Sequence, residues 1–456
     1  MPELESNPDM EFNTVQREVL RSNGSEEKSD SKPEFRAAVG LSREWDARKA
    51  GREVARNTLE KLGRNPDFFL LFSTIHYEKC GGFQKFLDGV WDVLPKGTPL
   101  IGGTVAGFIN PQGCFTRGAT AMAVSYPNMD VAVGVGRNTK RNPRSAAKWC
   151  AGLIKKGLKE SKYGRKYFIT LISSAIVPDL PILRKKKVIR NFPGVTLFLE
   201  MFDLFSSFFQ IGPGRDESIV KQFSEILPEY GGIGGASCDD LSLEKNVQYY
   251  MSNVTTNSIV SLGISIDKEF DLNKSLGLNP TGKILDITNI SRGGYTIKKI
   301  NHKPAVEEYL RLMGWSDNIL DERLYRKVFY YPIVQGEGNR KEPRMFGLVY
   351  GNNFVFPMEP NVTKNFEIYT SSGKDLLDSY HDLFSGKKYK NGFIISCGTR
   401  LETLGNKIFS VKEEILDKLI TEDYLLLFTA GEYIKKSKED TLTLYQSNNA
   451  LLVNQS

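Results

Sequence analysis

The sequence predicts an α/β fold made of internally repeated α/β lobes, with helix-covered sheets and a β-rich middle segment. Three observations lead to this prediction. Helical apolar spacing and short apolar runs alternate along the chain, and the same order of elements recurs at three places. Before the third place, residues 276–370 are rich in glycine, proline and alternating apolar positions, which is typical of β-structure.

The first copy begins with a predicted helix at 46–62 and an apolar strand at 68–73. A second helix follows at 83–94, where apolar residues recur at i, i+3, i+4 and i+7 until Pro95 ends the pattern. A short strand with an Ile-Gly-Gly exit at 101–103 closes the copy. The second and third copies repeat this order with predicted elements at 143–158, 168–173, 219–227 and 233–237, and at 375–384, 393–396, 411–420 and 425–428.

The spacing of the copies locates an insertion. The Ile-Gly-Gly exits at 101–103 and 233–235 lie 132 positions apart, whereas the strand ends Ser73 and Ser173 lie 100 positions apart. We therefore expect the two strands to be equivalent and Ile101 to match Ile233. The second copy must then hold about 32 extra residues, near 178–214.

Three regions are predicted along the chain. Residues 1–34 hold nine acids, four bases and one aromatic residue, which predicts a disordered acidic tail. Residues 35–270 contain the first two copies and residues 271–456 the third, so we expect two domains. The chain carries a net charge of +7 but no nucleic-acid-binding motif, and we expect no nucleic-acid partner.

Several function classes lack their sequence signature. No apolar stretch reaches the roughly 18 residues of a membrane-spanning helix, and the tail has no secretory signal, so we expect a cytoplasmic protein. The five cysteines have no paired spacing and the three histidines are isolated. Nucleophile elbows and phosphate-binding loops are also missing, so we predict neither an enzyme nor a metal or cofactor. An enzyme alternative, with Cys238 beside Asp239, would need a base from elsewhere in the fold.

The glycine exits and the polar residues behind them are candidate ligand-binding residues. In open α/β sheets, ligands bind beyond the carboxyl ends of the strands, where glycine lets them approach the backbone. Arg400 could hold a carboxylate, and Glu432 or Asp239 an ammonium. Alternatively, the glycines only form turns and the charges only pair with one another. The candidates are Gly102, Gly103, Thr104, Gly234, Gly235, Ser237, Asp239, Arg400 and Glu432.

The inserted segment of the second copy combines a basic cluster at 184–190 with many apolar residues at 195–211. So many exposed phenylalanines would need a cover. The segment could pack on its own core, form a lid over the ligand pocket, contact a partner or second subunit, or lie in an anionic membrane surface through 184–212. A lid or partner surface is favoured over the membrane, because Glu200 and Asp203 oppose insertion at an anionic interface.

The motifs as a set resemble those of the FIST domain family (F-box and intracellular signal transduction). The resemblance rests on the helix at 46–55, the strand end at 72–73 followed by His76-Tyr77, the sequence IGGTVAG at 101–107, and GGAS with two acids at 234–240. Toward the C-terminus it continues in TIKKINHKPAVEEY at 296–309 preceded by Tyr295, in SCGTR at 396–400, and in FTAGEY at 428–433.

The resemblance implies a FIST N-terminal domain at 35–270 and a FIST C-terminal domain at 271–456. It also implies an intracellular sensory module that binds a small ligand, an amino acid or derivative, and signals through a protein partner in trans. Some relatives are haem-based nitric-oxide sensors, which gives an alternative function with His76 and His302 as the candidate axial ligands.

Overall fold

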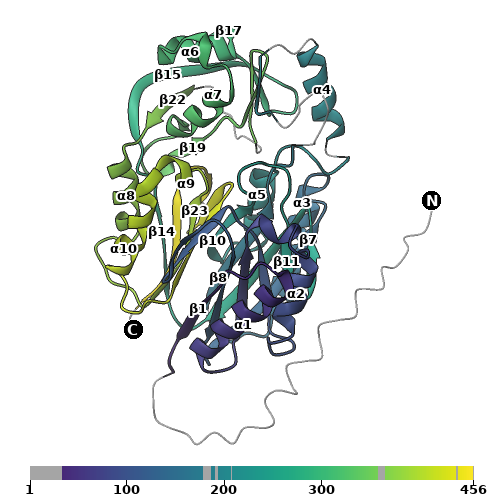
Figure 1. The fold of residues 1–456 in the computed structure, drawn as a ribbon, viewed down its shortest axis with the longest axis vertical. Helices are drawn as coiled ribbons and strands as arrows, with labels where there is room; N and C mark the ends of the chain where they lie inside the picture. Colours follow the sequence, from purple (N-terminus) through teal and green to yellow (C-terminus); the bar gives the residue numbers. More distant parts are fainter. Residues whose placement is uncertain are drawn as a thin grey trace, which may run out of the picture.

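The computed structural model describes residues 33–177, 186–190, 194–206, 208–357, 365–437 and 440–454. A body of three six-stranded sheets carries a cap built around a nine-stranded sheet (Figure 1). With 28% helix and 37% strand in several mixed sheets, the predicted α/β class is confirmed. The predicted acidic tail lies outside the described residues, apart from its last two positions.

The first sheet has the strand order β1-β6-β2-β3-β11-β12 and packs against helices α1 and α2. Asp46 begins α1, because its side chain accepts a hydrogen bond from the Lys49 N–H, and Gly63 in the left-handed region ends it. The elements are β1 (Arg36–Ser42), α1 (Ala47–Leu62), β2 (Phe68–Ser73), the 3-10 turn η2 (Ile75–Glu78), α2 (Phe83–Trp91), β3 (Leu100–Thr104), β6 (Ala119–Ser125), β11 (Gln248–Tyr250) and β12 (Asn253–Thr255).

The second sheet has the order β26-β25-β10-β8-β13-β7, and helices α3 and α5 pack against it. Pro143 occupies the first turn of α3, where its missing N–H costs nothing. The elements are β7 (Met129–Arg137), α3 (Pro143–Gly157), β8 (Arg165–Ser173), α5 (Asp216–Ile226), β10 (Gly231–Ser237), β13 (Ser258–Ile266), β25 (Glu432–Lys435) and β26 (Thr441–Leu444).

The third sheet has the order β14-β27-β23-β24-β4-β5 and packs against α8 and α10. Ser372 and Asp375 form a reciprocal capping box at the start of α8. The elements are β4 (Gly107–Asn110), β5 (Gly113–Phe115), β14 (Phe270–Ser275), α8 (Gly373–Asp382), β23 (Asn391–Cys397), α9 (Arg400–Thr403), η6 (Gly405–Ser410), α10 (Val411–Leu416), β24 (Tyr424–Thr429) and β27 (Asn448–Val453).

The three lobes interlock in a cyclic order. Each sheet contains one parallel pair, β2 with β3, β8 with β10 or β23 with β24. The hairpin that follows each pair crosses to another lobe: β4–β5 joins the third sheet, β11–β12 the first, and β25–β26 the second. The body therefore consists of three structural repeats, as the sequence predicts. The hairpin of each repeat pairs with the sheet of another repeat.

Backbone hydrogen bonds at the crossing points fix the alignment of the repeats. In each lobe an N–H just beyond the second strand of the parallel pair donates to a carbonyl near the end of the corresponding strand in another lobe. The three bonds, each 3.0 Å long, are Ala106 to Phe428, Cys238 to Thr104, and Ala430 to Ala236. The first two repeats are thus offset by 132 positions, which confirms the match of Ile101 with Ile233.

The strand ends align less simply. Phe72 and Leu171 both face the central core between the three sheets, so they are the equivalent pair. Ser73 and Ser173 then face opposite sides of their sheets and bind different partners, the Tyr249 hydroxyl at 2.6 Å and the Asn246 side-chain oxygen at 2.8 Å. The strands are equivalent as predicted, but the alignment of the two serines is wrong by one position, which in a strand reverses the face.

The cap contains the β-rich middle segment and the insertion of the second repeat. Its sheet has the order β19-β18-β22-β15-β16-β21-β20-β9, with β17 paired to β16. The elements are β9 (Val188–Ile189), α4 (Val195–Phe205), β15 (Asn279–Ile290), β16 (Thr296–Ile300), β17 (Lys303–Pro304), α6 (Ala305–Met313), η3 (Asp317–Ile319), α7 (Glu322–Lys327), η4 (Val328–Tyr330), β18 (Ile333–Gln335), η5 (Gly338–Arg340), β19 (Glu342–Arg344), β20 (Leu348–Tyr350), β21 (Asn353–Val355) and β22 (Asn365–Thr370).

The insertion packs on the cap through one face. Strand β9 pairs in parallel with β20, and Leu199 of α4 is buried against Leu348, Tyr350 and Val355. Residues 184 and 185 of its basic cluster lie outside the described residues. No helix in the described part of the chain is both long and apolar enough to cross a membrane.

Candidate functional site

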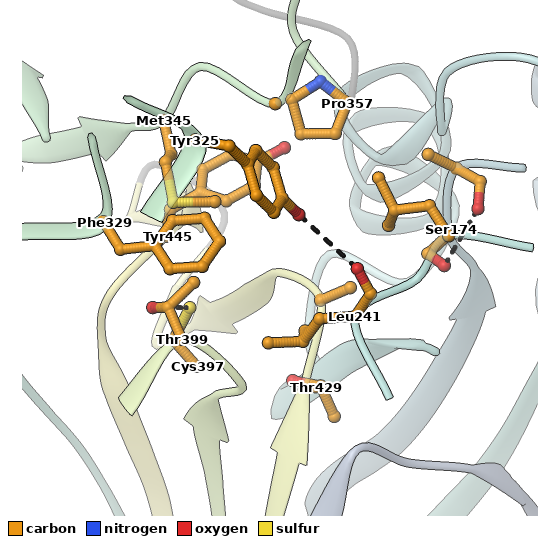
Figure 2. Close-up of a pocket in the computed structure, with 14 residues that line it drawn as sticks. Ser174, Leu241, Tyr325, Phe329, Met345, Pro357, Cys397, Thr399, Thr429 and Tyr445 are labelled. Carbon is orange, nitrogen blue, oxygen red and sulfur yellow. Dashed lines mark hydrogen bonds between the residues drawn. The ribbon is translucent and has the colours of Figure 1, made fainter. Parts of the chain in front are cut away.

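A small cavity, with about 30 Å³ of space for the centres of water molecules, lies between the body and the cap and is partly open to solvent (Figure 2). Its floor follows the carboxyl ends of β8, β23 and β24, where the sequence predicts a ligand site. The body contributes Ser174, Ala175, Leu241, Leu243, Cys397, Thr399, Thr429, Ala430 and Tyr445, and the cap contributes Tyr325, Phe329, Met345, Gly347 and Pro357.

The cavity wall is mostly apolar. Figure 2 shows Tyr325 reaching from the cap toward Leu241, and its hydroxyl donates to the Leu241 carbonyl at 3.4 Å. Cys397 Sγ and Thr399 Oγ1 lie 3.1 Å apart on the floor. Burial, followed by the nearby Glu432 carboxyl, raises the pKa of the Cys397 thiol to about 12. This thiol is therefore protonated at neutral pH, unlike a nucleophilic cysteine.

Ser174 is held by hydrogen bonds from two buried polar side chains, Lys140 and Asn246, which the sequence analysis did not identify. Its carbonyl accepts a hydrogen bond from the Lys140 ammonium at 2.6 Å, and its hydroxyl accepts one from the Asn246 amide at 3.2 Å. Burial lowers the pKa of Lys140 to about 7, while the charge of Asp216 opposes that shift. Lys140 and Asn246 hold the loop after β8 in place beside the cavity.

Asp239 organises the loop that follows β10. Its buried carboxylate accepts hydrogen bonds from the Ser242 hydroxyl at 2.7 Å and from the backbone N–H groups of residues 243–245 at 2.7 to 3.1 Å. These bonds position Leu241 and Leu243, which adopt positive φ angles and line the cavity. Asp239 itself is not among the lining residues.

Arg400 lies beneath the floor and is 1% exposed. Its guanidinium donates to the Leu276 and Gln446 carbonyls, both at 2.7 Å, and to the Ser379 hydroxyl at 3.0 Å. The neighbouring residue Thr399 lines the cavity, but Arg400 does not. In this structure Arg400 joins β14, α8 and the segment before β27.

Glu432 is the other charged candidate near the floor. It is fully buried, and its carboxyl oxygens lie 3.3 Å from the Thr429 and Ser447 hydroxyls. Burial raises its pKa to about 8, although the Ser447 hydrogen bonds and the charge of Arg400 lower it. Thr429 lines the cavity and Glu432 does not, so Glu432 is separated from the cavity by one residue.

The candidate glycines allow close approach between protein groups. A Cβ on Gly102 would lie 1.7 Å from the Leu71 carbonyl, and one on Gly103 would lie 2.7 Å from the Ser237 hydroxyl. The Thr104 hydroxyl accepts a hydrogen bond from the Val247 N–H at 3.1 Å. These residues lie in the first and second sheets, and none of them lines the cavity.

Gly234 and Gly235 make the same kind of contact. A Cβ on Gly235 would lie 2.6 Å from the Thr429 hydroxyl, and one on Gly234 would lie 1.9 Å from the Tyr433 ring. Ser237 is buried, and its hydroxyl has no hydrogen-bond partner among the described residues. The glycines bring strands β10 and β25 together beneath the cavity.

Gly234→Ala is expected to lower the free energy of unfolding by about 1–3 kcal/mol, because the added methyl group overpacks a rigid contact. Urea denaturation would measure the change. The control is Gly152→Ala on α3, where a Cβ meets nothing within 4 Å. If Gly234→Ala were as stable as this control but bound a ligand more weakly, the glycine would be needed for ligand binding and not for the packing of the strands.

The cap residues of the cavity carry no signal in the sequence. Tyr325, Phe329, Met345 and Pro357 come from the β-rich middle segment, where aromatic and apolar residues are frequent and form no motif. Tyr445 follows a hairpin strand that crosses between lobes. Only an arrangement of the repeats in space brings these side chains over the glycine exits.

The histidines do not fit a haem in this cavity, since none of its lining residues is a histidine. The His76 ring nitrogen Nδ1 lies 3.2 Å from the Thr74 hydroxyl, and burial together with Arg117 lowers the His76 pKa. His302 lies in an exposed turn of the cap with a φ of 65°. Among the described residues, no group of three or more His, Cys, Asp or Glu side chains could hold a metal ion.

Two solved structures cover most of the chain at very low identity. Cyanuric acid hydrolase from A. caulinodans is 4% identical, with 93% of this chain and 100% of the hydrolase covered and a TM-score of 0.35. PurLQS from Thermotoga maritima is 8% identical, with coverages of 92% and 73% and a TM-score of 0.19. Both scores are too low to support an argument about fold or function.

No curated protein matches the chain. The FIST N domain model, in contrast, matches residues 67–303, which is more than half of the sequence. This range contains the first repeat from β2 onward, the second repeat with the loop organised by Asp239, and part of the cap. The predicted C-terminal domain at 271–456 stays a prediction. The chain belongs to the FIST family, a family of sensory domains.

Proposed function

We propose that this protein is a non-enzymatic sensory module that binds a small ligand, an amino acid or derivative, in the cavity between body and cap. The observation that carries the proposal is the position of the cavity. Its walls come from two bodies of the fold, so a ligand that contacts both changes the free energy of their association.

The cavity wall favours an amino-acid-like molecule with an apolar side chain. Tyr325, Phe329 and Met345 form an apolar upper wall, while Thr399 and Thr429 present hydroxyl groups on the floor. A ligand with one apolar end and one polar end matches this division. In this proposal Glu432, one residue beyond Thr429, pairs with a ligand ammonium, and Arg400, which follows Thr399 in the chain, pairs with a carboxylate.

The same wall argues against catalysis. Among the described lining residues there is no histidine, lysine, aspartate or glutamate, and the one thiol is protonated at neutral pH. A hydrolytic or transfer reaction would need a base within hydrogen-bond reach of its nucleophile. We therefore propose that ligand binding changes the contact between cap and body, and that a protein partner in trans reads this change.

Native mass spectrometry and an absorption spectrum of the purified full chain would test the ligand class. The expected result is a retained amino-acid-like metabolite, or stabilisation by members of an amino-acid panel in thermal denaturation. A Soret band would instead support the haem alternative. Release of a chemically altered product from a panel member would contradict a non-enzymatic role.

Phe329→Ala is expected to weaken binding at least about tenfold, because burying an aromatic side chain is worth roughly 1.5–3 kcal/mol. Calorimetry with the ligand from the panel measures this. Phe409→Ala is the matched control, since Phe409 is exposed on η6 and lies outside the cavity. If Phe329→Ala and Phe409→Ala bound the ligand with equal affinity, the ligand would bind outside this cavity.

A further inference from the structure

Helix α4 carries an apolar stripe that none of the described residues covers. Leu197, Met201 and Phe205 follow one another at intervals of four residues and are each at least half exposed. The opposite side of the helix is covered by the cap, through Leu199. Phe208 and Phe209, in the turn after the helix, are 60% and 64% exposed and extend the same apolar surface.

The apolar stripe continues into a basic face on the second lobe. The Arg141 guanidinium lies over the Phe208 ring, 5.1 Å from its centre, and the Gln210 amide donates to the Asn138 side chain at 3.3 Å. Both contacts join the turn after α4 to the loop before α3. Figure 1 shows α4 and α3 on the same side of the molecule.

Residues 137–166, which include α3, contain eleven lysines and arginines and a single acid, Glu160. Six of these cations form no ion pair with any described residue: Arg137, Arg141, Arg144, Lys148, Lys155 and Lys156. Trp149 projects from the same helix and is 63% exposed. The face thus combines unpaired positive charge with large exposed apolar side chains.

We propose that this face, formed by α3, α4 and the turn at 208–209, is a docking surface for an anionic membrane. Cations near the surface of a membrane are attracted to acidic headgroups, while Phe, Trp, Leu and Met side chains enter the boundary with the acyl chains. The aliphatic members of the stripe favour lipid over nucleic acid, because bases stack on aromatic rings and not on Leu197 or Met201.

The docking surface and the candidate ligand site do not share residues. The cavity between body and cap is lined by other residues. Membrane docking and ligand binding therefore use separate surfaces and can be tested separately.

Sedimentation of the full chain with vesicles tests the proposal. Vesicles of phosphatidylcholine with phosphatidylserine should bind the protein, whereas phosphatidylcholine alone should bind at least tenfold less, and added salt should weaken the binding. Phe208→Ser with Phe209→Ser should reduce binding to the mixed vesicles about tenfold or more, and so should Arg144→Glu with Lys148→Glu. The matched controls, Phe409→Ser and Arg56→Glu with Lys96→Glu, change equally exposed residues on other faces and should bind normally.

Three results would overturn the proposal. Equal binding to both kinds of vesicle would exclude recognition of acidic headgroups. Loss of binding in the charge variant alone, together with tight binding of a single-stranded oligonucleotide, would indicate a nucleic-acid surface. A dimer in light scattering that dissociates on Phe208→Ser with Phe209→Ser would show that a second copy covers the stripe. Circular dichroism of each variant distinguishes loss of binding from loss of folding.

Discussion

Arg400→Ala is expected to lower the free energy of unfolding by about 3–5 kcal/mol, because it breaks a fully buried network around a charge. The guanidinium donates three hydrogen bonds, to the Leu276 and Gln446 carbonyls and the Ser379 hydroxyl. Alanine would leave the Leu276 and Gln446 carbonyls without this donor, while the Ser379 hydroxyl would keep the hydrogen bond from the Asn448 amide. Chemical denaturation of the full chain, read by fluorescence, would measure the loss.

Two further variants make this result specific. Arg400→Lys keeps the charge but cannot reach three separated acceptors with the geometry of a guanidinium, so it should restore only part of the stability. Lys412→Ala changes a cation on the same lobe that makes no hydrogen bond or ion pair with the described residues, and should leave the stability within about 0.5 kcal/mol.

The sequence supports a different outcome for the same change. If Arg400 holds the carboxylate of a ligand, as the motif SCGTR suggests, Arg400→Ala should keep its fold and bind the ligand more than tenfold more weakly. A stable variant with weakened binding would therefore favour the ligand role. An unstable variant whose folded fraction binds normally would favour the structural role that the hydrogen bonds describe.

The contrast shows where the sequence is informative. The repeat of Ile101-Gly102-Gly103 at residues 233–235 predicted two equivalent lobes, because strands that must pack closely against carbonyls require glycine at fixed positions. It could not predict that each hairpin crosses to another lobe. That crossing depends on pairing between strands hundreds of residues apart, such as β24 with β4.

The candidate site divides in the same way. The sequence placed the ligand at the carboxyl ends of the strands, and the cavity lies there, beside Thr429 and Cys397. The candidates that were chosen for charge, Asp239, Arg400 and Glu432, lie just behind its surface in hydrogen-bonded networks. A charged side chain after a strand has the same pattern whether it faces a ligand or a backbone carbonyl, so their ligand-binding role stays a prediction.

Glu432→Gln is expected to remove a pH dependence of stability. Burial raises the pKa of this carboxyl to about 8 in the folded protein, against 4.5 for an ordinary glutamate. The folded state therefore holds the proton more tightly than the unfolded state. The stabilisation from this proton is complete below about pH 4.5 and is lost as the pH rises through about 8. The loss over this range is on the order of 5 kcal/mol.

The test compares wild type and Glu432→Gln in denaturation series between about pH 5 and pH 9. The stability of wild type relative to the variant should fall with increasing pH, because the glutamine amide stays neutral throughout. Glu413→Gln, at an exposed position of α10, is the matched control and should follow the wild type. If the stability of wild type relative to Glu432→Gln instead rose with increasing pH, the folded state would favour the charged carboxylate. The charge of Arg400 would then outweigh the effect of burial on Glu432.

The same proton connects Glu432 to ligand recognition. A ligand ammonium next to Thr429 would favour the ionised carboxylate, so binding at neutral pH would release a proton from Glu432. The binding enthalpy of wild type should then change with the ionisation enthalpy of the buffer, while that of Glu432→Gln should not. A ligand without an ammonium would give the same enthalpy in every buffer for both proteins, because the carboxyl would keep its proton.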